Sequence, residues 1–171
     1  GLEYGSRKFA IGATPSINYF TNYIYLNPTS EHDRLYGNGN QVFNYTQSEV
    51  LRYGAELHVH YELFRSLQIG LIGEYVYSEQ LSGAKKGYTL PFSPPASALI
   101  NLKYQKQKFR MKFVENAYFS VDYRITAAQN NIVPPEVPTK GYQIVNLSFG
   151  GDIPLKKQHI SIAMQVQNLF N

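Results

Sequence analysis

Apolar and polar side chains alternate along several stretches of the chain, which is the pattern of a β-strand with one apolar and one polar face. The clearest stretch runs from Tyr53 to Leu63, where odd positions are apolar and even positions are glycine, glutamate or histidine. Because helical spacing of apolar residues fails almost everywhere, the pattern predicts an all-β protein. Strands are predicted over 8–26, 41–51 continuing into 53–64, 67–78, 97–105, 119–126, 141–153 and 160–167.

The connections between these strands alternate in length. A basic connection over 104–117 is intermediate, and Pro15 interrupts the first strand, which predicts a bulge or a sheet edge there. Short turns at one end of the strands and long loops at the other are typical of an outer-membrane barrel. Short turns are predicted at 5–7, 64–66 and 154–158, and long polar connections at 27–41, 79–91 and 129–141.

Two architectures give strands with one apolar face. In a soluble sandwich that face points into a protein core, whereas in a membrane barrel it points outward to lipid and the polar face lines the lumen. Charged and histidine side chains lie mid-strand on the polar faces and favour the barrel, although a solvated sheet face gives the same pattern. We predict that the following side chains face the lumen or a plug within it: Glu56, His58, His60, Glu62, Asp122 and Arg124.

Two of these side chains have the spacing of metal ligands. His58 and His60 share a face about 7 Å apart at the rise of a strand, and such a pair is able to hold a divalent metal. Hydrogen bonding within a polar lumen explains the pair more simply, so no metal site is predicted. For Asp122 and Arg124 we likewise expect a structural role, in a salt bridge or in contacts with neighbouring strands.

The aromatic content supports a membrane location. The 171 residues include 15 Tyr and 10 Phe but no Trp. Aromatic rings that gather near both strand ends are expected where amphipathic side chains meet lipid headgroups. Near the long loops lie Tyr23, Tyr25, Tyr45, Tyr75 and Tyr77, and near the short turns lie Phe9, Tyr61, Phe64 and Tyr104.

Composition and charge exclude several classes of protein. With no Cys, the chain has no disulfide, no thiol nucleophile and no cysteine-ligated metal. The net charge of +4 is scattered over connections and forms no basic face, so no nucleic acid partner is expected. Phosphate-binding loops and hydrolase motifs are missing from the sequence. We therefore predict no enzymatic activity, no catalytic residue and no cofactor.

The order of several motifs resembles the C-terminal part of a TonB-dependent outer-membrane receptor. Each motif is short, but their succession spans essentially the whole chain. They are INYFTNYIYL at 17–26, FNY at 43–45, YGAEL at 53–57, GEYVY at 73–77, LPFSPP at 90–95 and VQNLFN at 166–171.

This resemblance implies a fold and a function. Residues 1–171 would form one segment, about eight strands of an antiparallel up-and-down transmembrane β-barrel of 22 strands, with the plug domain and final strand outside this sequence. The implied function is uptake of a scarce ligand across the bacterial outer membrane, most simply a ferric siderophore or another iron complex. The implied partners are outer-membrane lipid and lipopolysaccharide, the protein's own plug domain and the TonB energy-transducing complex.

Ligand contacts are expected in the long loops, where charged and aromatic residues are exposed. The candidates are His32, Asp33, Arg34, Tyr36, Gln129, Asn130 and Asn131.

Two alternative interpretations follow from the same pattern. The first is a complete eight-stranded outer-membrane barrel that acts as an anchor or adhesin. The second is a soluble ligand-binding β-barrel with apolar residues lining its cavity.

Overall fold

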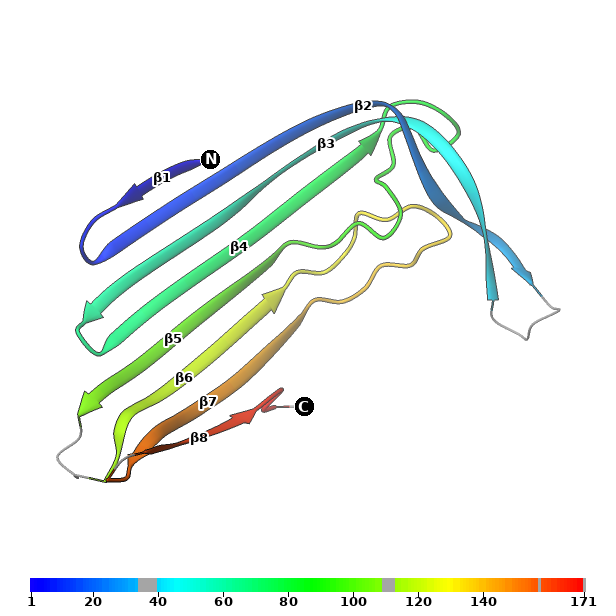
Figure 1. Ribbon diagram of the computed structural model, residues 1–171. Coiled ribbons are helices and arrows are strands. Elements are labelled where there is room, and N and C mark those ends of the chain that lie inside the picture. Colours follow the sequence, from blue (N-terminus) through cyan, green and yellow to red (C-terminus); the bar gives the residue numbers. More distant parts are fainter. Residues whose placement is uncertain (34–39, 109–112, 157, 171) are drawn as a thin grey trace.

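The computed structural model describes residues 1–33, 40–108, 113–156 and 158–170. These residues form a single antiparallel sheet in which every strand pairs with the next one along the chain (Figure 1). The all-β prediction is confirmed, because the described residues contain no helix. The strands are β1 (Leu2–Gly5), β2 (Phe9–Asp33), β3 (Asn40–Phe64), β4 (Leu67–Gln80), β5 (Ser97–Lys108), β6 (Glu115–Thr126), β7 (Tyr142–Pro154) and β8 (His159–Val166).

The sheet is an open arc within the described residues. Its order runs from β1 to β8 without pairing between these two edge strands, and the two chain ends lie at opposite edges (Figure 1). The alternative of a complete eight-stranded barrel requires that pairing, so the structure contradicts it.

Strand register separates the two faces in the middle of the sheet. Through this region, from Phe9 to Phe20 on β2 and along the facing parts of the other strands, paired residues share a face, so the mainly apolar face and the mainly polar face stay separate. One apolar row holds Ile11, Val59, Leu71, Ile100, Tyr123 and Val145. The adjacent row on the opposite face holds Ala10, His60, Gly70, Asn101, Asp122 and Asn146.

No second layer covers the apolar face in the described part of the chain. Ile17 is 74% exposed and Met164 is 58% exposed, and the apolar side chains of β8 are at least 38% exposed. The larger buried apolar side chains among the described residues are Val50, Leu90 and Val133, which lie near the long connections, and Pro28 in the β2–β3 hairpin. So many exposed apolar side chains on one face mark a contact surface for lipid or for another protein segment.

The β2–β3 hairpin is longer than the sequence predicts. The segment 27–41 is predicted as a loop, yet β2 continues to Asp33 and β3 begins at Asn40. The register shifts between Pro28 and His32, and there Thr29 Oγ1 donates to the Val42 carbonyl at 2.8 Å and the Gln41 side-chain amide donates to the Thr29 carbonyl at 2.9 Å, which bridges the irregularity. The far part of the hairpin projects beyond the end of β4 and bends in an arch at the end of the sheet that carries the long connections (Figure 1).

The predicted bulge also lies elsewhere. Pro15 pairs in register with Ala55, and the register of β2 with β3 shifts between Phe20 and Tyr23 and again between Pro28 and His32. Pro15 does lie at an edge, because the pairing of β1 with β2 ends at Ala13. The shift between Phe20 and Tyr23 is a bulge that marks the start of the arched part of the hairpin, as expected where an extra residue increases strand twist and bend.

The remaining connections follow the predicted alternation. Short turns join β1 to β2, β3 to β4 and β7 to β8, and long connections occupy 81–96 and 127–141. Strands β5 and β6 extend further toward each other than predicted, to Lys108 and from Glu115, and residues 109–112 lie outside the described part.

Candidate functional site

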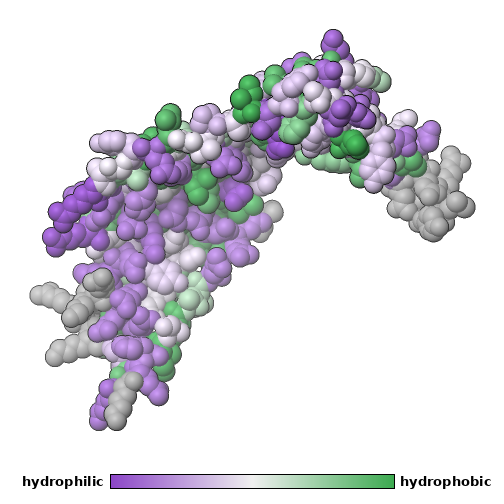
Figure 2. Space-filling model, turned by 45° about the horizontal axis from the view of Figure 1, so that its top comes forward, coloured by the Kyte–Doolittle hydropathy of each residue, from purple (hydrophilic) through white to green (hydrophobic). Residues whose placement is uncertain are grey.

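The polar face carries all six side chains predicted to face a lumen. Register places them in four successive rows of this face, with Glu62 nearest the short turns and Glu56 furthest from them. In Figure 2, hydrophilic residues dominate the visible surface to the left of the arched β2–β3 hairpin. Whether this face lines a lumen or contacts a plug stays a prediction.

The imidazole of His58 lies against a glycine of the neighbouring strand. His58 lies opposite Gly12 on β2, and a Cβ on Gly12 would collide with the imidazole ring. The glycine therefore provides the space into which the ring folds. No group of three His, Asp or Glu side chains able to hold a metal occurs in the described part of the chain.

Asp122 and Arg124 do not form the salt bridge considered from the sequence. Asn101 instead donates from Nδ2 to Asp122 Oδ1 at 2.5 Å and to Ser120 Oγ at 3.0 Å. Arg124 is exposed and lies in the same row as His58. The second possibility raised for Asp122, a contact with a neighbouring strand, is the one observed.

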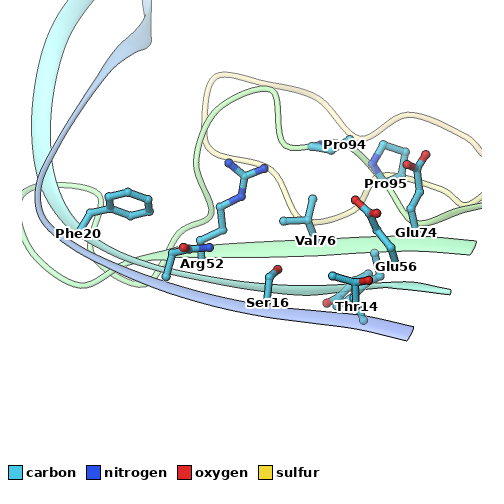
Figure 3. Close-up of a pocket in the computed structure, with 12 residues that line it drawn as sticks. Thr14, Ser16, Phe20, Arg52, Glu56, Glu74, Val76, Pro94 and Pro95 are labelled. Carbon is cyan, nitrogen blue, oxygen red and sulfur yellow. The ribbon is translucent and has the colours of Figure 1, made fainter. Parts of the chain in front are cut away.

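A cavity of about 500 Å³ lies on the polar face beneath the connection before β5. Three strands form its floor and a pair of prolines its roof, while Phe20 closes one end (Figure 3). The volume is within the range of about 300–1,000 Å³ for small-molecule sites. The lining side chains include Thr14, Ser16, Asn18, Phe20, Arg52, Glu56, Glu74, Val76, Pro94 and Pro95.

Sequence reasoning missed most of this cavity. It identified Glu56 but not its cross-strand partner Glu74, nor Arg52 two rows away on the same face. A signal was present, because Glu56 and Glu74 are equally distant from Arg65 in the tight turn, so that turn sets them opposite each other. The roof residues Pro94 and Pro95 follow from no local pattern.

The two long connections are joined into one body by a carboxylate. Glu136 accepts the backbone N–H of Phe92 at 2.7 Å through Oε1 and that of Val133 at 3.1 Å through Oε2. Lys85 Nζ adds a hydrogen bond to the Pro134 carbonyl at 2.8 Å. Phe92 has a φ of 58°, which is unusual for an aromatic residue. The centroid of its ring lies 5.9 Å from that of Phe43 in the hairpin.

The hairpin is tied to the same body through a buried glutamine. Gln80 is fully buried and accepts the Tyr25 hydroxyl at 2.5 Å, while its amide donates to the Thr89 carbonyl at 2.7 Å. Burial raises the pKa of the Tyr25 phenol, which lies in the arched part of the hairpin beyond the first register shift. The long connections therefore form a fixed roof over the polar face.

The predicted loop ligands are distributed unevenly. The backbones of His32 and Asp33 pair at the tip of the hairpin, while Arg34 and Tyr36 lie outside the described residues. Gln129 and Asn131 line a second cavity of about 200 Å³ under the roof, and Asn130 is exposed. The Gln129 amide donates to the Ser93 carbonyl, which gives this residue a structural contact. Ligand contact by any of these residues stays a prediction.

Comparison with known proteins agrees with this architecture. Residues 1–169 match the family described as TonB dependent receptor-like, beta-barrel. No curated protein matches the sequence.

Among solved structures, the fold is similar to that of a protein described as copper transporter OprC, with a TM-score of 0.78 and 17% sequence identity. The alignment covers 98% of this chain but 24% of that protein, so the chain spans about a quarter of its structural neighbour. This likeness shows the fold, and the family match covers nearly the whole chain. The chain belongs to the TonB-dependent receptor family of β-barrels, which lie in the bacterial outer membrane.

Proposed function

We propose that this chain is part of the wall of an energy-coupled outer-membrane transporter that takes up a scarce metal complex. The observation that carries the proposal is the cavity on the polar face, roofed by the joined connections, in a chain of the TonB-dependent receptor family. An exposed apolar face on the opposite side supports a location in lipid.

Iron complexes are the first candidate cargo, most simply a ferric siderophore. Copper is the second, because the similar solved structure is described as a copper transporter. In either case the proposed partners are a plug domain that faces the polar side of the sheet, the TonB complex that supplies energy, and lipid and lipopolysaccharide on the apolar side. We propose no catalytic step.

An uptake assay tests this function. A strain that lacks the whole gene is complemented with the full-length protein, and uptake of radiolabelled ferric siderophores and of copper is measured with and without TonB. We expect TonB-dependent uptake of at least one of these cargoes above the empty-vector level. Equal uptake with the protein and with the empty vector for all cargoes would contradict the proposal.

A further inference from the structure

The cavity described above has opposite charges at its two ends. Glu56 and Glu74 lie directly opposite each other on β3 and β4, and Arg52 lies two rows further toward the long connections. Figure 3 shows the two carboxylates near Pro95 and Arg52 nearer Phe20. At a rise of about 3.3 Å per residue, Arg52 and Glu56 are about 13 Å apart along β3.

The middle of the cavity floor is free of long side chains. The row between the charged rows consists of Ser16, Gly54 and Val76. Gly54 cannot be enlarged, because a Cβ there would collide with the Tyr75 carbonyl of β4. An elongated hollow therefore separates the acidic end from the basic end.

None of these three charges is neutralised within the described part of the chain. Glu74 accepts the Ser97 hydroxyl at 2.6 Å, but Glu56, Glu74 and Arg52 make no ion pair there. Carboxylates placed directly opposite each other in a sheet repel, so a cation between them is favourable. The guanidinium of Arg52 likewise favours a carboxylate or phosphate partner.

From this arrangement we infer that the cavity binds a dipolar small molecule, with its cationic group between Glu56 and Glu74 and its anionic group on Arg52. Asn18 and Ser16 supply hydrogen bonds along its length, and Phe20 packs against the anionic end. The inference rests on the proposed function, because it names the chemical class of the molecule that the transporter holds.

A peptide of matched length is a suitable probe. Four residues in extended conformation span about 13 Å, so unblocked tetra-alanine separates its ammonium and carboxylate by about the distance between the two charged rows. Its N-acetyl and C-amide forms each remove one charge and keep the same backbone. Binding of all three is measured by titration calorimetry on the full-length protein in detergent.

The unblocked peptide is expected to bind about tenfold or more tightly than either capped form. In the Glu56→Gln/Glu74→Gln double variant, N-acetylation should no longer weaken binding, and in Arg52→Gln, C-amidation should no longer weaken it. Glu62 and Arg124 lie on the same face outside the cavity. The control variants Glu62→Gln and Arg124→Gln should therefore discriminate between capped and unblocked peptides as the parent protein does.

Equal affinity for capped and unblocked peptides would overturn the inference. Loss of discrimination in the control variants would also overturn it. Failure of the unblocked peptide to bind would overturn it as well, and this result is expected if another segment of the protein fills the cavity. The uptake assay and the binding assay test different claims. Transport without charge-selective binding overturns only this inference, whereas charge-selective binding without transport overturns only the proposed function.

Discussion

The imidazole of His58 lies over Gly12 on the neighbouring strand, in the space that a side chain at Gly12 would fill. Gly12→Ala should therefore force the ring out of this position and destabilise the protein by about 1–3 kcal/mol. The measurement is the urea dependence of unfolding in detergent. The double variant with His58→Ala is the control: if Gly12→Ala costs as much there as in the parent protein, the ring is not what the glycine accommodates.

Adjacent residues on β5 should respond differently to a charge. Ile100 lies on the apolar face and Leu99 on the polar face. Because an arginine facing lipid at mid-membrane costs about 2–4 kcal/mol, Ile100→Arg should destabilise the folded protein by that amount, and Leu99→Arg much less. Both are measured by unfolding in lipid vesicles. Equal costs at the two positions would argue against a lipid-facing side.

Removal of the Tyr25 hydroxyl should loosen the arched hairpin. Tyr25→Phe leaves Gln80 Oε1 buried without its donor, which costs about 1–3 kcal/mol. Amide hydrogen exchange over the hairpin and the 81–96 connection should speed up. Tyr45→Phe is the matched control, because Tyr45 is 81% exposed. This variant should change neither the stability nor the amide exchange of the two segments. Identical exchange in both variants would show that the contact does not hold the hairpin.

Glu136 should hold the two long connections together. Glu136→Gln replaces one acceptor oxygen with a donor, so the amide of Phe92 or Val133 loses its partner, and exchange at these amides should accelerate about tenfold or more. The exposed Glu31, changed to Gln, provides a comparison that should leave both amides unaffected. Unchanged protection in Glu136→Gln would mean that other contacts, such as that of Lys85, suffice.

Most of the sheet was predictable because a strand's side chains alternate with a fixed period of two. Tight turns, such as the one at Arg65, then fix which residues pair, so Val59 and Leu71 meet without any knowledge of the tertiary structure. The same reasoning places all six predicted polar residues on one face.

The roof was not predictable in the same way. Proline, asparagine and threonine near Pro28 suggest a loop, yet the strands pair on both sides of the register shift that Thr29 bridges. The role of Glu136 depends on contacts between segments about forty residues apart along the chain, as in its bond to Phe92. Such contacts leave no periodic pattern in the sequence. The cavity under the roof depends on them, so it could not be predicted from the sequence either.

The central claim is that one face of this sheet lies against lipid and the other does not. Leu71 and Ile72 are adjacent aliphatic residues on opposite faces of β4. Nitroxide labels introduced through Leu71→Cys and Ile72→Cys in the full-length protein, reconstituted in vesicles, report collisions with oxygen in lipid and with a nickel chelate in water. The label at 71 should collide mainly with oxygen and the label at 72 should not; the reverse pattern, or equal oxygen collision at both positions, would contradict the account.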